Sequence, residues 1–160
     1  MSAASARLDG EAIAARRAAR LAAVQALYQM EMAGSSSATA VKDVLNGHLP
    51  ADEDGALDGD VDSDLFRQIV ETTVERQSEV DTLLAAHLAR GWKLERLDAV
   101  ARAILRAGLM ELWRRRDVPT AVVINEYVEI AKSFFDGQEP GFVNATLDAC
   151  LPAVRGGPGE

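Results

Sequence analysis

Apolar residues recur every three or four positions along most of this 160-residue chain, and no stretch alternates between apolar and polar residues for long. Such spacing gathers apolar side chains on one face of an α-helix, whereas a strand needs a period of two. Aromatic residues make up only 5% of the chain and alanine is abundant, which favours close-packed helices over a β-sandwich. The sequence therefore predicts an all-α fold.

Glycine, proline and short polar runs divide the helical pattern. The predicted helices cover residues 11–33, 38–45, 62–89, 94–115, 119–135 and 142–154. A polar side chain at 62–64 would cap the third helix, and Gly91 would follow its end. Pro119 fits the first turn of the predicted helix at 119–135. The polar run at 75–79 is either a break or an exposed turn.

The same punctuation predicts the domain organisation. We expect a disordered tail over residues 1–10, a single helical domain over 11–154 with an acidic loop at 46–61, and a frayed tail over 155–160. No run of 18 uncharged apolar residues and no signal-peptide pattern is present, so no membrane contact is expected. The only cysteine, Cys150, excludes an intrachain disulfide, is predicted to be buried and inert, and suits a cytoplasmic protein.

Charge is distributed unevenly. The net charge is −8, and residues 43–64 hold eight acids with no Lys or Arg, so the remainder of the chain sums to zero. A neutral remainder can carry a local basic patch, and local potential steers a polyanion more than the total charge does. The acidic balance therefore does not exclude a nucleic-acid partner.

A cluster of arginines near the N-terminus is the candidate for such a patch. Arg16 and Arg20 are four residues apart and share a helical face, and Arg17 lies about 100° away. Guanidinium groups at these positions could bind phosphates or guanine edges. The alternative is an ordinary solvated face. A second cluster at 114–116 is explained by the preference of cations for a helix C-terminus.

Aromatic residues near the polar loop at 136–141 allow two interpretations. Phe134, Phe135 and Phe142 either form a core cluster that anchors this loop, or they are exposed rings on which unpaired bases stack. Trp92 and Trp113 are expected to pack at helix ends.

No catalytic or metal-binding pattern emerges. The acidic stretch from Asp58 lacks the glycine and glutamate of a calcium loop, and His48 and His87 have no cysteine partner for zinc. Phosphate-binding glycine loops and a nucleophile elbow are also absent from the sequence. We therefore expect a protein without catalytic activity, cofactor or metal.

Three blocks in order resemble the NusB family of bacterial transcription antitermination factors. They are residues 16–28, 92–112 and 117–148, which include Ile124-Asn125-Glu126, Ala131-Lys132-Ser133-Phe134 and Phe142-Val143-Asn144. The resemblance implies an all-α fold of two packed three-helix bundles, with about seven helices. It implies a non-catalytic adaptor that binds single-stranded boxA RNA of ribosomal RNA leader transcripts. It also implies pairing with the small-subunit ribosomal protein NusE, and indirect action on RNA polymerase with other Nus factors.

The resemblance also assigns residues. The expected RNA-binding residues are Arg16, Arg17, Arg20, His87, Lys132, Phe134, Gln138 and Phe142, and the expected protein-partner residues are Tyr28, Arg106 and Glu111. At three positions the chain departs from the family pattern. Ala18 and Gly141 stand where basic residues occur, and Ala101 stands where some relatives have an acid, which would weaken those contacts.

Two other functions stay open on the sequence. One is a detached relative of the domain fused to ribosomal RNA cytosine methyltransferases, although the chain has no room for a nucleotide-binding domain. The other is a purely protein-binding helical module, which could form a homodimer that covers its RNA-binding face.

Overall fold

The computed structural model describes residues 3–45 and 61–156, which form seven α-helices, one 3₁₀ turn and no strand. The described part of the chain confirms the all-α prediction. It divides into two compact units, residues 1–70 and 71–160, with the boundary inside helix α3. The first unit holds two helices and the first part of a third, whereas the second holds the rest of that helix and four more.

The first unit contains α1 (Ala3–Ala33), α2 (Ser37–Leu45) and the start of α3 (Ser63–Glu75). Helix α1 begins at Ala3, so the expectation of disorder over residues 1–10 does not hold for its described part. The buried positions of α1 include Ala19, Ala22, Ala23 and Ala26. Their small side chains allow neighbouring helices to approach closely. Most of the predicted acidic loop, residues 46–60, lies outside the described residues.

Helix α3 is attached to α1 at its first turn. The Asp62 carboxylate accepts the Leu65 backbone N–H at 3.0 Å, which makes Asp62 the N-cap among the three candidates at 62–64. The Asp62 backbone N–H donates to the Ala15 carbonyl at 3.1 Å. This bond fixes the start of α3 beside the arginine segment of α1.

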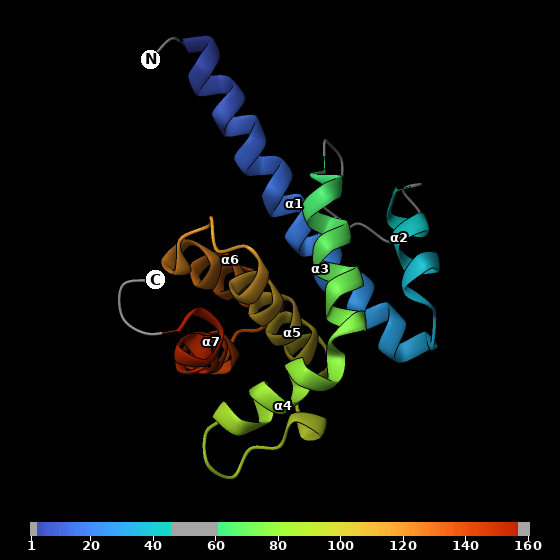
Figure 1. Ribbon diagram of the computed structural model, residues 1–160, viewed down its shortest axis with the longest axis vertical. Helices are drawn as coiled ribbons and strands as arrows, with labels where there is room; N and C mark the ends of the chain where they lie inside the picture. The colour runs from blue at the N-terminus through green and yellow to red at the C-terminus, as the bar shows by residue number, and fades with distance from the viewer. Residues whose placement is uncertain (1–2, 46–60, 157–160) are drawn as a thin grey trace. The chain divides into compact units, whose positions relative to one another are not determined.

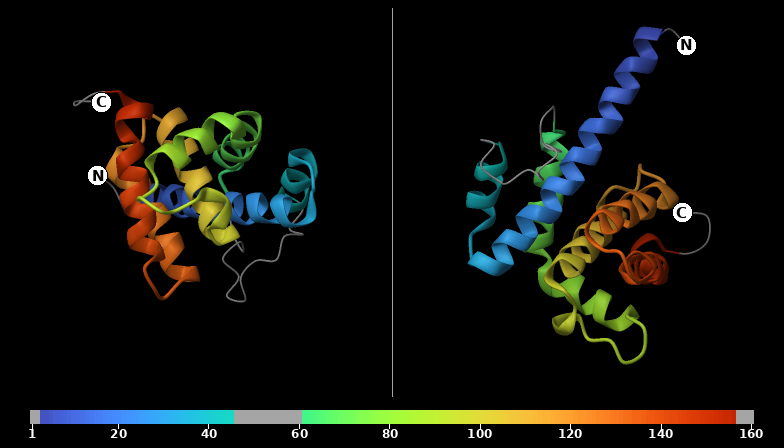
Figure 2. Two further views of the ribbon diagram at one scale, coloured as in Figure 1. Left: turned by 90° about the horizontal axis from the view of Figure 1, so that it is seen from below. Right: turned by 180° about the vertical axis from the view of Figure 1, so that it is seen from behind.

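The second unit contains α4 (Gln77–His87), a 3₁₀ turn η1 (Leu94–Arg96), α5 (Ala99–Arg114), α6 (Thr120–Phe134) and α7 (Glu139–Arg155). Helices α5, α6 and α7 pack against one another, and α4 contacts α5 and α7 (Figures 1 and 2). Helix α5 is buried almost continuously from Ala101 to Leu112, as befits a central helix.

Gly108 allows a close approach of α5 to α6 and α7. A Cβ atom added at Gly108 would lie 2.9 Å from Leu147 Cδ1 and 3.3 Å from Tyr127 Cγ. Both of these side chains are fully buried. The absence of a side chain on α5 therefore lets α6 and α7 come together over it.

Arg155 of α7 satisfies backbone carbonyls at the end of α5. Buried Arg155 donates hydrogen bonds to the carbonyls of Leu112, Arg115 and Val118, at 2.6, 2.9 and 2.8 Å. The Leu112 carbonyl belongs to the last turn of α5, and those of Arg115 and Val118 follow the end of that helix, where backbone acceptors lack helical partners. Burial and the nearby Arg116 charge lower the pKa of Arg155. Because Arg155 is buried and fixed, the predicted frayed tail does not begin at residue 155.

Several predicted boundaries shift. The run at 75–79 contains a true break, since Arg76 separates α3 from α4. Gly91 has a left-handed φ of 91° but lies in a turn four residues beyond the end of α4, so it is not that helix's C′ residue. The predicted helix 94–115 is split by Asp98, which caps α5 by accepting the Val100 N–H at 2.8 Å. Pro119 precedes α6 as its N-cap residue.

Candidate nucleic-acid interface

The arginine segment of α1 is only partly exposed. Arg16 and Arg17 are exposed, whereas Arg20 is 3% exposed. Sharing a helical face with Arg16 did not make Arg20 accessible, because α1 changes from an exposed to a buried environment along this segment. The expectation that Arg20 presents its guanidinium to RNA is therefore not met in this structure. Arg16 and Arg17 lie on the exposed part of this segment.

The end of α6 and the following loop expose the predicted aromatic and polar groups. Phe134 is 43% exposed and Gln138 is exposed, while Phe135 and Phe142 are half-buried. The three phenylalanines therefore do not form a fully buried cluster, and base stacking on them stays a prediction. Lys132 is exposed and its ammonium lies 3.0 Å from the Glu129 carboxylate, so its charge is partly neutralised.

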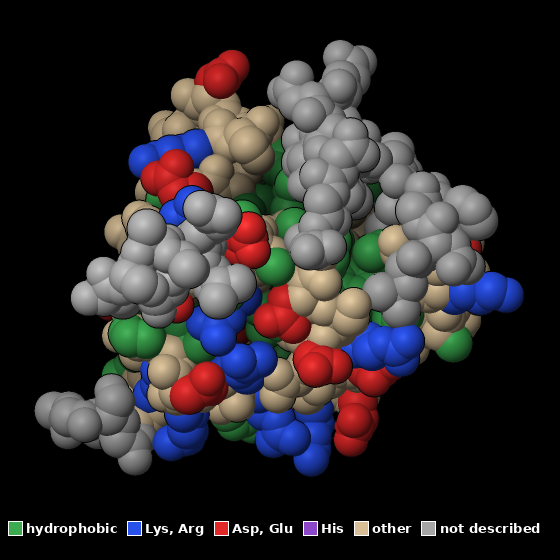
Figure 3. Space-filling model, turned by 90° about the horizontal axis from the view of Figure 1, so that it is seen from above, with side chains coloured by type: hydrophobic (Ala, Val, Ile, Leu, Met, Phe, Trp, Pro, Cys, Tyr) green, Lys and Arg blue, Asp and Glu red, His purple; other side chains and the backbone are tan. Residues whose placement is uncertain are grey.

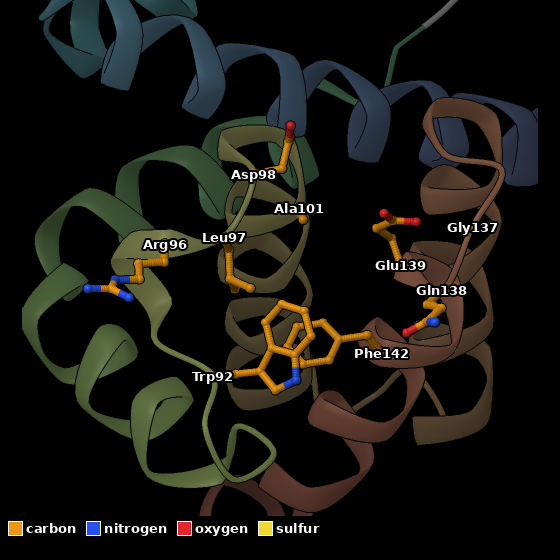
Figure 4. Close-up of a pocket in the computed structure, with 9 residues that line it drawn as sticks. All are labelled: Trp92, Arg96, Leu97, Asp98, Ala101, Gly137, Gln138, Glu139 and Phe142. Atoms are coloured by element: carbon orange, nitrogen blue, oxygen red, sulfur yellow. The ribbon is translucent and has the colours of Figure 1, made fainter.

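A cleft of about 600 Å³ opens between the α6–α7 loop and the start of α5 (Figure 4). Its residues are Trp92, Arg96, Leu97, Asp98, Ala101, Gly137, Gln138, Glu139 and Phe142. Trp92 and Phe142 form a tilted aromatic pair with centroids 5.1 Å apart and an interplanar angle of 42°. Two predicted RNA-binding residues, Gln138 and Phe142, thus share one cleft.

Trp92 is a residue of this site that the sequence did not predict there. It was expected to pack at a helix end, but it is 53% exposed in the segment between α4 and η1. The sequence signal that could have indicated its role is its position beside Gly91 in a short connection between helices, where binding residues are common. The buried guanidinium of Arg102 positions this connection by donating to the carbonyls of Leu94 and Leu97, at 3.1 and 2.8 Å.

His87 lies at the end of α4 and is half-buried. Its Nδ1 atom is 2.8 Å from the Leu83 carbonyl oxygen. A carbonyl oxygen only accepts hydrogen bonds, so Nδ1 carries a proton in this contact. In the neutral ring the remaining nitrogen, Nε2, is then an acceptor.

Of the three predicted protein-partner residues, only Tyr28 is exposed. It is 37% exposed on α1. Glu111 is buried in the second unit, where it accepts a hydrogen bond from the Tyr127 hydroxyl at 2.8 Å. Glu111 is therefore an internal residue, and its assignment to an interface is wrong for this structure.

Arg106 is also committed to an internal contact. Its Nε and Nη2 atoms donate to the two carboxylate oxygens of Asp81, at 2.8 and 2.9 Å. The side chains are 12% and 28% exposed. This paired geometry joins α5 to α4, so Arg106 stabilises the second unit rather than presenting a free charge.

The face drawn in Figure 3 does not form one basic field. On the face drawn in Figure 3, Lys and Arg side chains are interspersed with Asp and Glu side chains. A phosphate contact on this face would therefore depend on single Lys or Arg side chains and local geometry. Within the described residues, no cluster of His, Cys, Asp and Glu could hold a metal ion, and no helix is long and apolar enough to cross a membrane.

Comparison with known proteins identifies the family. The sequence matches the NusB family over residues 17–152. The chain belongs to the NusB family. The transcription antitermination protein NusB of Caulobacter vibrioides is 49% identical over 92% of this chain and 99% of its own length. The protein of the same name from Rhizobium leguminosarum bv. trifolii is 50% identical over 88% of each chain.

Solved NusB structures share the fold. NusB of T. maritima superimposes with a TM-score of 0.68 and 31% identity, covering 85% of this chain and 89% of its own. A second similar structure comes from a complex of the antitermination factors NusB and NusE with double-stranded RNA. It has a TM-score of 0.70 and 25% identity, and covers 86% of this chain and 96% of its own.

Proposed function

We propose that this protein is a transcription antitermination factor that binds boxA RNA of ribosomal RNA leader transcripts together with the ribosomal protein NusE. In this role it modulates elongation by RNA polymerase as a non-catalytic adaptor in the cytoplasm. The observation that carries the proposal is the near-full-length identity to relatives named transcription antitermination protein NusB. The complex of a NusB relative with NusE and RNA supports the choice of partners.

RNA binding is proposed for groups that are exposed and of suitable chemistry. Arg16 and Arg17 would hold phosphates through guanidinium hydrogen bonds, which position a strand without reading its sequence. Phe134 and the cleft that contains Phe142 would take unpaired bases by stacking. Lys132, Gln138 and the Nε2 atom of His87 would add polar contacts to the RNA.

NusE is proposed to contact the end of α1. Tyr28 and Met32 are one helical turn apart and both are exposed, although their large apolar surfaces would normally be buried. Aromatic and Met side chains are enriched at the centres of protein interfaces. An apolar pair on a helix therefore suits a protein partner better than RNA.

The test is to measure binding of a boxA-type single-stranded RNA across a salt series, with and without NusE. Each phosphate contact to a single strand contributes about 0.7 to the slope of log K against log salt. Replacing Arg16 and Arg17 by alanine should therefore flatten the slope by about 1.4 and weaken binding. The matched control replaces two exposed arginines outside this segment, Arg67 and Arg114, and should leave the slope nearly unchanged.

Salt-sensitive binding that tightens with NusE would support the adaptor. A slope that stays the same in the Arg16 and Arg17 double variant would remove these residues from the interface. If the RNA fails to bind with or without NusE, the family and fold stand but the proposed RNA-binding function fails.

A further inference from the structure

The cleft of the second unit combines a stacking surface with hydrogen-bond acceptors. Figure 4 shows the Trp92–Phe142 pair at one end of the cleft, with Gln138 and Glu139 on the α6–α7 side. Asp98 and Ala101 lie on the α5 side. The guanidinium of Arg96, the one Lys or Arg among the residues drawn in Figure 4, points away from the ring pair. Two carboxylates line the cleft, which makes its interior unsuited to a phosphate.

Trp92 provides a flat apolar surface that is accessible. It is 53% exposed although it already contacts Phe142, so a large part of the indole is open to a ligand. Stacking of a base on such a ring is worth about 1–3 kcal/mol, and it is nearly independent of which base is bound. This surface explains affinity for an unpaired base but not a choice among bases.

The choice can come from Glu139. Its Oε2 atom is buried and has no hydrogen-bond donor among the residues that the structure describes. The carboxylate lies against Gly137, where an added Cβ would be only 3.0 Å from Oε2. The absence of a side chain at Gly137 thus makes room for the carboxylate. A buried acceptor without a donor is costly, so a ligand that supplies a donor is favoured.

We propose that this cleft binds a guanine base of the single-stranded RNA, with Trp92 stacked on the ring and the Glu139 carboxylate accepting from its edge. The inference rests on the proposed RNA-binding function and adds a base preference to it. The Watson–Crick edge of guanine presents two adjacent N–H donors, which match the two oxygens of one carboxylate. Uracil offers one donor there, while adenine and cytosine place an acceptor nitrogen beside their amino group.

The experiment uses the full chain and a set of uridine nonamers with one central position varied. The central base is guanine, inosine, adenine, cytosine or uracil, and a boxA-type RNA serves as the reference. Inosine keeps the guanine ring but lacks the amino group, so it removes one of the two donors. Dissociation constants are measured with and without NusE by fluorescence anisotropy.

Wild-type protein should bind the guanine nonamer about tenfold more tightly than the inosine and uracil nonamers, as expected for one good two-bond base contact. Glu139→Gln should abolish this preference while retaining binding of the uracil nonamer. Glu95→Gln removes the same charge from an exposed position outside the cleft and should retain the preference. Trp92→Leu should weaken binding of every nonamer by about tenfold, and Trp92→Phe should recover part of the loss.

Two results would overturn the inference. If guanine and inosine bind equally to the wild type, or if the preference survives in Glu139→Gln, the carboxylate does not read the base. Retained binding of the boxA-type RNA in that case leaves the proposed function intact. If the boxA-type RNA does not bind with or without NusE, both the base preference of the cleft and the proposed RNA-binding function are overturned. Circular dichroism of each variant separates these outcomes from a failure to fold.

Discussion

The ion pair between Arg106 and Asp81 offers the sharpest test of the structure, because the family resemblance predicts Arg106 at a protein interface instead. Two parallel hydrogen bonds of 2.8 and 2.9 Å join the side chains, which belong to α5 and α4. The perturbation is a double-mutant cycle made of Arg106→Met, Asp81→Asn and the double variant. Met retains most of the aliphatic stem of Arg, so the cycle removes mainly the charge and its hydrogen bonds.

The magnitude follows from the partial burial of the pair. Exposed ion pairs contribute about 0.2–1 kcal/mol, whereas breaking a buried pair costs about 3–5 kcal/mol. Here the side chains are 12% and 28% exposed, and the contact has two bonds. Solvent screening lowers the value below the buried limit, so the coupling free energy should be about 1–2 kcal/mol.

Urea denaturation of the four proteins measures the coupling, and binding to NusE is measured in parallel. The matched control is the cycle for Arg76 and Glu79, an ion pair of 2.9 Å whose side chains are 42% and 53% exposed. That cycle should show no measurable coupling. A coupling near zero for Arg106 and Asp81 would refute the structural reasoning. The same conclusion would follow if the Arg106→Met variant is folded and as stable as the wild type but no longer binds NusE.

Three further predictions concern the interior of the second unit. Tyr127→Phe should destabilise the protein by about 1.5–3 kcal/mol in urea denaturation, because it removes a buried hydrogen bond to the Glu111 carboxylate; an unchanged midpoint would contradict this. Burial raises the pKa of Cys150 from 9.0 to about 11. The thiol therefore loses its proton at a lower pH in the unfolded chain than in the folded protein. The stability that the buried neutral thiol provides is complete below pH 9 and is lost between pH 9 and 11. The free energy of unfolding of the wild type should therefore fall relative to that of Cys150→Ala by up to about 3 kcal/mol across that window. If the two proteins show parallel curves of unfolding free energy against pH, burial does not raise the pKa of the thiol. Gly108→Ala should destabilise by about 1–3 kcal/mol through overcrowding, whereas Gly10→Ala in open space on α1 should be neutral or stabilising; thermal melts of both variants make the comparison.

Local sequence information predicted most of the helical structure. The spacing of apolar residues placed six helical segments, and the capping group of α3 lies within the predicted window at 62–64. The buried environment of Cys150 was also predicted. These features depend on residues within one or two turns of each other, where helical geometry fixes which side chains share a face. The break at Arg76 was left open because a polar run has the same composition in a loop as on a solvated turn.

Burial and long-range pairing were decided by the tertiary structure. Arg16 and Arg20 share a helical face, yet only Arg16 is exposed. Glu111 reads as a surface acid in the sequence, but packing places the Tyr127 hydroxyl beside it. Trp92 and Phe142 are fifty positions apart and meet only because α7 packs on α5 and α4. A helical period states which residues point the same way, but only the neighbouring elements determine whether that direction leads to solvent, to a buried partner or into a cleft.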